Sequence, residues 1–385
     1  MILGIIVGII ALSILVATHE LGHAIIARRN GVVVEEFGIG FPPRAYSRVV
    51  KKSFLGNNVR FSINWLPIGG FVKLQGEHDA ADKKGDYGAA TFWQKTKILF
   101  AGVAVNWLTA VVLFTGLSLV GLPKLIDNQF YIASDASVTN HPVKIGQVGE
   151  KLPAATAGLE TGDEVISFDG TTISSPTQLS NLAKEHKGET VSVVYKRDDV
   201  TRHTVVTIRE ENTDGHGYFG AGISKQQDTI RATWSAPIVG IVTTAQLTQA
   251  TLQGLGDMIV TLASGLIQQF SGDAAVSGAA KQQIAELSNT VAGPVGIFGV
   301  IFPAAEQAGF AQVILLTAVV ALSLAVMNAL PIPALDGGRW FVTALFRLCK
   351  KPLLKDTEEK IQAGGFLFLM SLIVLVTIAD IGKLM

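Results

Sequence analysis

The chain has 385 residues, and its composition is that of a membrane protein with room for one soluble domain of about 100 residues. Hydrophobic residues make up 49% of the chain and charged residues 16%, with a mean hydropathy of +0.41, whereas soluble proteins carry roughly 25% charged residues. The formal net charge of zero gives no electrostatic reason to expect a nucleic-acid partner. A single cysteine, Cys349, excludes an internal disulfide and argues against a cysteine-ligated zinc site.

The first predicted element is a membrane-spanning helix over residues 2–27. It lacks the positive n-region and the small-residue cleavage pattern of a signal peptide, so we expect it to be retained. Within it, residues 19–23 read H-E-x-x-H, which brings His19 and His23 onto one helix face, where two imidazoles can bind one metal ion. Glu20 lies beside them as a candidate general base, and zinc is the metal that these ligands favour.

A chance match is the alternative, with both histidines hydrogen-bonded to neighbouring helices. Polar side chains are costly inside an apolar span unless they have partners or a function, which favours the metal site.

The distribution of Lys and Arg predicts on which side of the membrane the metal motif lies. Residues 24–97 carry twelve Lys and Arg, and the much longer segment 120–310 also carries twelve. The denser segment is predicted to be cytoplasmic, which places the metal motif near the cytoplasmic face.

Residues 58–75 alternate in polarity and are predicted to form a β-hairpin with its turn at residues 67–70. This is either a plain surface hairpin or a strand edge that holds an extended substrate beside the active site. A second span follows at residues 98–120. Its Gly102 and Asn106 lie four residues apart on one face, where they serve either helix packing or the lining of the active cavity.

The next segment, residues 142–210, has the pattern of a soluble α/β domain, either a peptide-binding module or a spacer. Residues 237–270 are amphipathic and are predicted to lie in the outer interface, although a further pair of spans is the alternative. The third and fourth spans are predicted at residues 310–330 and 364–381.

An aspartate follows the third span, just past a helix break at Pro331 and Pro333. Such a residue often only caps a helix at the interface. Here, however, the two histidines of the H-E-x-x-H motif still lack a third metal ligand, and this aspartate is a candidate for it. Two histidines and one carboxylate leave an open position on the metal for water. Basic residues follow Asp336, so the charge argument brings this end to the cytoplasmic side as well, where the histidine motif lies.

Together these residues resemble the site-2 protease family of intramembrane zinc metalloproteases, and its bacterial members with a single PDZ domain in particular. The resemblance covers nearly the whole chain. The motifs that carry it are His19-Glu20-x-x-His23, Gly38-Ile-Gly40-Phe-Pro-Pro43, Pro67-x-Gly-Gly, Gly102-x-x-x-Asn106, Gly293-Pro-Val-Gly296 and Asn328-x-x-Pro331-x-x-x-x-Asp336-Gly337.

The resemblance implies one catalytic zinc ion with His19, His23 and Asp336 as ligands and Glu20 as the base. It implies that Asn328, Gly69 and Gly70 position the substrate, and Asn106 is expected to serve as a substrate-positioning residue with them. It also implies a PDZ domain on the extracytoplasmic side, with peptide binding near Ala157, Gly158 and Leu159. Many relatives carry two PDZ domains in tandem, whereas this chain has room for one.

The predicted fold is a multi-pass α-helical membrane protein with four transmembrane helices, a membrane-associated β-hairpin and one inserted α/β PDZ domain. We expect an N-terminal membrane region at 1–122, the PDZ domain at 123–228, an interfacial helical linker at 229–309 and a C-terminal membrane region at 310–385. The expected location is the bacterial cytoplasmic membrane.

The expected activity is zinc-dependent cleavage within the transmembrane segments of single-span proteins, such as anti-sigma factors or signal-peptide remnants, with the PDZ domain as a substrate filter. Two other classes of protein are weighed against it. A metal-dependent membrane scaffold would not need the base Glu20. A zinc transporter would need polar residues through the middle of several spans, whereas here they cluster near one leaflet.

Overall fold

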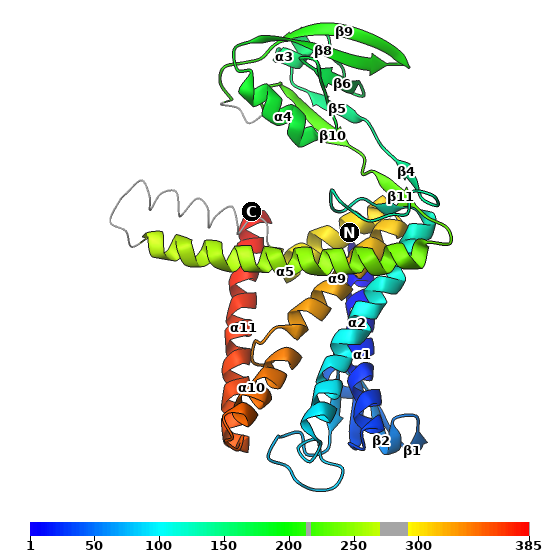
Figure 1. Cartoon of the computed structure of the whole chain (residues 1–385), viewed down its shortest axis with the longest axis vertical. Helices are drawn as coiled ribbons and strands as arrows, with labels where there is room; N and C mark the ends of the chain where they lie inside the picture. The colour runs from blue at the N-terminus through cyan, green and yellow to red at the C-terminus, as the bar shows by residue number, and fades with distance from the viewer. Residues whose placement is uncertain (213–216, 270–291, 385) are drawn as a thin grey trace. The chain divides into compact units, whose positions relative to one another are not determined.

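The computed structural model describes residues 1–212, 217–269 and 292–384, and it divides the chain into two compact units (Figure 1). The first unit is formed by Met1–Val120 together with Thr233–Met385, and the second by Gly121–Ala232. The second unit is thus an insertion between two halves of the first.

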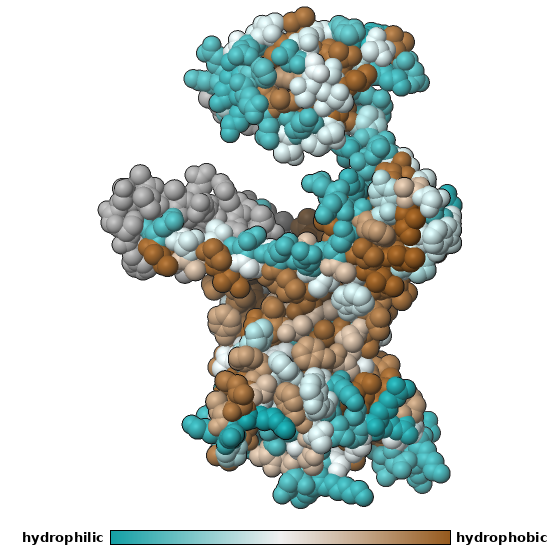
Figure 2. Space-filling view, in the orientation of Figure 1, coloured by the Kyte–Doolittle hydropathy of each residue, from teal (hydrophilic) through white to brown (hydrophobic). Residues whose placement is uncertain are grey.

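Four helices of the described residues, all in the first unit, are long and apolar enough to cross a membrane. They are α1 (Ile2–Arg29), α2 (Phe92–Val120), α9 (Phe310–Ala329) and α11 (Lys355–Leu384). Apolar residues cover the middle of this unit, and hydrophilic residues gather at the end that carries β1 and β2 (Figure 2). The four predicted spans therefore have their counterparts in the structure, and the chain is an integral membrane protein.

The helix α2 begins before the predicted span because a capping box starts it. The Thr91 backbone N–H donates to Gln94 Oε1 at 2.8 Å, and the Gln94 N–H donates to Thr91 Oγ1 at 3.3 Å. This reciprocal pair satisfies two donors at the helix start. Farther along, a Cβ on Gly22 of α1 would lie 2.9 Å from the Ala101 carbonyl oxygen of α2. Glycine at position 22 therefore lets these two helices approach closely.

The long strands β1 (Val34–Ser53) and β2 (Gly56–Leu74) form an antiparallel pair that differs from the predicted hairpin. Glu36 is paired with both Lys73 and Arg60, and Ile39 with both Gly70 and Ile63, so residues 36–39 lie between two segments of β2. The predicted turn at 67–70 was wrong, because it lies inside β2. The two halves of β2 pair with β1 and not with each other.

The segment after the inserted unit runs across the spans. The helix α5 (Ala236–Gln269) packs against α2 and crosses the membrane helices rather than running along them (Figure 1). It is not among the candidate spans, and its placement agrees with an interfacial helix. The rest of the predicted linker up to residue 291 lies outside the described residues. After it come α7 (Pro294–Gly296), a π-helical turn (Ile297–Ile301) and α8 (Phe302–Ala308).

The connection from α9 to α10 (Asp336–Leu348) depends on glycine. A Cβ on Gly337 would lie 2.6 Å from the Leu330 carbonyl oxygen, and one on Gly338 would overlap the Ile332 backbone. These two glycines let the first turn of α10 fold back onto the proline-containing loop. Asp336 is thereby fixed at the start of α10.

The second unit is built on a six-stranded sheet with the strand order β10-β5-β6-β8-β9, and with β7 paired to β6. Its core is a single cluster that includes Val165, Phe168, Leu179 and Phe219. The elements are β3 (Leu122–Pro123), β4 (Ser137–Thr139), β5 (Val143–Val148), α3 (Pro153–Thr156), β6 (Glu164–Phe168), β7 (Thr171–Thr172), α4 (Pro176–Glu185), β8 (Thr190–Arg197), β9 (Val200–Thr207), β10 (Ala221–Lys225) and β11 (Thr229–Arg231). The strands β3, β11 and β4 form a separate small sheet.

Candidate active site

Three side chains predicted as metal ligands meet in the first unit. His19 and His23 come from α1, and Asp336 comes from the first turn of α10, more than 300 residues later. Asp336 Oδ2 lies 3.1 Å from His19 Nε2 and 3.2 Å from His23 Nε2, and the two Nε2 atoms are 3.1 Å apart. Both histidines are buried. The structure thus brings together two helices that the sequence keeps far apart.

The geometry of these three atoms fits a metal ion. In a tetrahedral zinc site with ligands at about 2.0–2.1 Å, neighbouring ligand atoms are about 3.3 Å apart, close to the three edges of this triangle. His23 Nδ1 lies 2.7 Å from the Ile98 carbonyl oxygen, so Nδ1 carries the proton and Nε2 presents its lone pair. A cation is the natural partner for two imidazole lone pairs and a carboxylate that converge in this way.

The outer contact of His19 is with Asn106. The Asn106 amide nitrogen lies 3.2 Å from His19 Nδ1, while the Asn106 amide oxygen is buried without a hydrogen-bond partner. Rotating the amide by half a turn exchanges these atoms. Asn106 Oδ1 then accepts the Nδ1 proton of His19 and leaves Nε2 free to bind metal, as the Ile98 carbonyl does for His23. Asn106 is therefore the outer partner of His19, one of the three predicted metal ligands.

Gly102 leaves the room that the ligands need. A Cβ at this position would lie 2.6 Å from both His19 Nε2 and His19 Cε1, and closer still to His23 Nε2. No side chain larger than hydrogen fits there without moving the imidazoles. Of the two roles that the sequence left open for Gly102 and Asn106, the lining of the site is the one that these contacts support.

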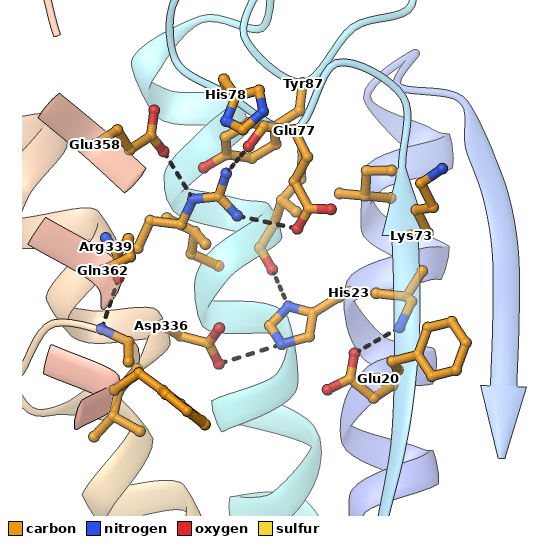
Figure 3. Close-up of a pocket in the computed structure, with 18 of the residues that line it drawn as sticks. Glu20, His23, Lys73, Glu77, His78, Tyr87, Asp336, Arg339, Glu358 and Gln362 are labelled. Atoms are coloured by element: carbon orange, nitrogen blue, oxygen red, sulfur yellow. Dashed lines mark hydrogen bonds and ion pairs between the residues drawn. The ribbon is translucent and has the colours of Figure 1, made fainter. Parts of the chain in front are cut away.

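Glu20 is oriented by the sheet. Its Oε2 accepts a hydrogen bond of 3.0 Å from the Val72 backbone N–H of β2 (Figure 3). The neighbouring Gly69 has φ +85°, a conformation that favours glycine. A Cβ on Gly70 would lie 3.0 Å from the Gly38 carbonyl oxygen and 3.5 Å from Ala17 Cα in α1. Glycine at position 70 therefore lets the strand lie close to the helix that bears the histidines.

A cavity of about 980 Å³ opens at this site. Its lining includes Glu20, His23, residues 70–74 of β2 and Asp336. It also includes Arg339, which in the sequence is only one of several basic residues after Asp336. In the described part of the chain, residues 70–74 pair only with β1, so their other edge borders the cavity.

Other predicted site residues lie elsewhere. The Asn328 amide donates to the Leu324 carbonyl of its own helix at 3.0 Å, and Asn328 does not belong to the cavity lining described above. In the second unit, Thr204 donates to the Ala157 carbonyl, Arg197 donates to the Gly158 carbonyl, and Leu159 is buried in the core. These contacts give the three residues a role in the fold of the unit, and peptide binding there stays a prediction.

Comparison with known proteins agrees with this geometry. Residues 7–372 match the model of peptidase family M50. A Clostridium perfringens protein whose provisional name is that of a zinc metalloprotease is 32% identical, and the alignment covers 98% of each chain. RasP of Bacillus subtilis, a regulator of sigma-W protease, is 26% identical over 98% of this chain and 97% of its own.

Among solved structures, the PDZ domain of the SdrC-like protein from Listeria monocytogenes is 25% identical and aligns with 23% of this chain and 92% of that domain, with a TM-score of 0.21. The family match, by contrast, spans almost the whole chain, the Clostridium perfringens relative bears the name of a zinc metalloprotease, and RasP bears that of a protease. The chain therefore belongs to peptidase family M50, the site-2 protease family, and is a zinc metalloprotease.

Proposed function

We propose that this chain is an endopeptidase that hydrolyses peptide bonds inside the transmembrane segments of other membrane proteins, with one zinc ion held by His19, His23 and Asp336. The observation that carries the proposal is the convergence of three donor atoms within 3.2 Å of one another. They belong to buried or half-buried side chains of an integral membrane protein. A carboxylate in the role of base, Glu20, lines the same cavity.

Zinc, when bound, polarises a peptide carbonyl and makes a coordinated water acidic. Glu20 takes the proton of the attacking water and passes it to the leaving amine. The Val72 N–H holds one oxygen of the Glu20 carboxylate at 3.0 Å, which leaves the other oxygen for the water. The Asn106 amide and the Ile98 carbonyl keep the two imidazoles oriented.

The substrate must be extended where it is cut. A transmembrane helix hides its carbonyl groups in internal hydrogen bonds, and exposed backbone in lipid costs several kcal/mol per group. Residues 70–74 of β2 border the cavity and, apart from the Val72 N–H that holds Glu20, offer backbone groups on the edge that is not paired with β1. An unwound substrate adds there as a strand and regains its hydrogen bonds. Helix-breaking residues in the substrate therefore favour cleavage.

The substrates that we propose are single-span membrane proteins, such as anti-sigma factors, and signal peptides left in the membrane. The relative RasP is by name a regulator of sigma-W protease, which supports the first class. The location we propose is the bacterial cytoplasmic membrane, with the active site near the cytoplasmic face, because basic residues are dense in the segment 24–97 that follows the histidine motif.

The second unit, in this proposal, is a PDZ domain on the extracytoplasmic side that excludes substrates with bulky outer domains. Its strand β10 forms one edge of the six-stranded sheet, and α4 packs beside it. An extended peptide can add to β10 between the strand and the helix. This edge is a better candidate for peptide binding than residues 157–159, because the Ala157 and Gly158 carbonyl groups are engaged within the unit and Leu159 is buried.

The test is Glu20→Gln in the full-length protein, purified in detergent and assayed on a model transmembrane substrate. The variant is expected to keep its zinc and to lose cleavage by at least about 10²-fold, as for removal of a general base. Asp257→Asn, at an exposed carboxylate of α5 that does not line this cavity, is the control and should cleave normally. Near-normal turnover by Glu20→Gln would refute the assigned base. A membrane scaffold, by contrast, would show no metal-dependent cleavage even in the wild type.

A further inference from the structure

The side chain of Arg339 lies in the same cavity as the metal ligands, one helical turn after Asp336 (Figure 3). Its Nη1 is 3.2 Å from Glu77 Oε1, and its Nη2 donates to the Glu77 carbonyl oxygen. Its Nε is 3.4 Å from Glu358 Oε1, and the guanidinium lies over the Tyr87 ring, 4.6 Å from the ring centroid. Each of the three guanidinium nitrogens thus has a partner.

These partners belong to different segments of the chain. Glu77 and Tyr87 lie in the cytoplasmic loop, residues 75–91, that joins β2 to α2, and Glu358 lies in the first turn of α11. Glu358 is only 3% exposed, and its other oxygen accepts a hydrogen bond of 2.8 Å from the Asp79 backbone N–H of the same loop. The loop and α11 therefore meet at Arg339 and at the carboxylate that pairs with it.

The first turn of α10 has few other polar anchors. Trp340 Nε1 donates to Thr96 Oγ1 of α2 at 2.9 Å. Arg339, by contrast, joins α10 both to the loop, through Glu77, and to α11, through Glu358. A planar guanidinium can bond two groups in fixed directions at once, so it resists rotation of the helix that carries it.

We propose that Arg339 is a positioning residue for the third metal ligand. By bonding Glu77 and Glu358 it fixes the first turn of α10, and with it the distance from Asp336 to His19 and His23. The loop that supplies Glu77 continues directly from β2, whose Val72 N–H holds Glu20. Arg339 thus links the helix of the third ligand to the strand that orients the base. The inference rests on the proposed role of Asp336 as a ligand.

The experiment measures the zinc affinity of full-length protein in detergent by competition with a chelator. Arg339→Met keeps the length of the stem but removes the guanidinium, and the zinc Kd is expected to rise about tenfold or more, as for other outer partners of metal ligands. Arg347→Met, two turns along the same helix with an exposed side chain over the Phe92 ring, is the matched control and should leave the Kd unchanged.

A second readout separates positioning from general destabilisation. With cobalt in place of zinc and the site saturated, the visible absorption bands of Arg339→Met should change in position or intensity, because the ligand geometry has changed. Glu77→Gln, whose side chain is 41% exposed, serves if Arg339→Met does not fold. It is expected to raise the zinc Kd by a smaller factor and to alter the cobalt spectrum in the same direction.

Wild-type affinity and an unchanged cobalt spectrum in folded Arg339→Met would overturn the inference. If that variant does not fold, the same result in Glu77→Gln would overturn it. A wild-type protein that binds no zinc at all would refute the proposed function instead, so the two failures can be told apart.

Discussion

The substitution Gly102→Ala is expected to disable the metal site by adding one methyl group. The new Cβ would lie 2.6 Å from His19 Nε2 and closer to His23 Nε2, whereas non-bonded heavy atoms rest about 3.5 Å apart. The imidazoles would have to retreat by about 1 Å. They are not free to do so, because His19 contacts Asn106 and His23 contacts the Ile98 carbonyl.

The size of the effect follows from the tolerance of metal sites. Ligand distances must be met within about 0.2 Å, and a displacement of about 1 Å at a catalytic site costs about 10²-fold. We therefore expect a loss of zinc affinity of at least about 10²-fold, which corresponds to about 2.8 kcal/mol. As a helix residue, alanine should by itself stabilise α2 by about 0.5–1 kcal/mol relative to glycine.

The control is Gly116→Ala in the same helix, where, apart from the backbone of its own helix, no heavy atom of the described residues lies within 4 Å of the added Cβ. Both variants are purified in detergent, and their metal content, zinc Kd and cleavage of a model transmembrane substrate are compared. Gly116→Ala should match the wild type in all three. If Gly102→Ala binds zinc within threefold of the wild type and cleaves normally, the packing argument at the metal site is wrong.

Three further predictions concern single residues. Asp336→Asn should lower the bound zinc per chain, measured by elemental analysis, and unchanged stoichiometry would remove Asp336 from the ligand set. Asn106→Leu should raise the zinc Kd about tenfold, while Asn106→Asp, which keeps an acceptor for His19 Nδ1, should stay near the wild type; equal losses would refute the rotated amide. In the second unit, burial raises the pKa of Asp163, but hydrogen bonds from Arg197 and the Glu160 N–H outweigh it and hold that pKa below its usual value. A depressed folded-state pKa gives stability that is present above about pH 3.9 and lost as the pH falls through the folded-state pKa. The hydrogen-exchange protection factors of β6 and β8, which are corrected for the intrinsic slowing of exchange in acid, should therefore fall on acidification in the full-length wild type. They should fall less in Asp163→Asn, which is already less protected at neutral pH.

Much of the site could be predicted from sequence because its signals are local. The H-E-x-x-H spacing needs only a helix, and the position of Asp336 follows from a proline break at the end of an apolar span. The charge argument then placed both motifs near one leaflet. The structure brings the three side chains within hydrogen-bond distance, which no local pattern could guarantee.

The parts that were missed depend on contacts between distant residues. In β1 and β2, residues 36–39 pair on both sides, and alternation of polarity reports which residues can be strands but not which strands pair. Arg339 looked like one more cytoplasmic cation, and its ion pair with Glu358 and its contacts with Glu77 depend on residues distant in the sequence. The Thr91–Gln94 capping box was readable in the sequence and would have placed the start of α2 correctly.

The most direct test of the central claim is X-ray absorption at the zinc edge on the Glu20→Gln variant, which should hold its metal without turning over. The account predicts one zinc per chain with two imidazole nitrogens and oxygen donors at about 2.0–2.2 Å, no sulfur, and a changed first shell in Asp336→Asn. A sulfur ligand, a different number of imidazoles, or an identical spectrum in Asp336→Asn would contradict it.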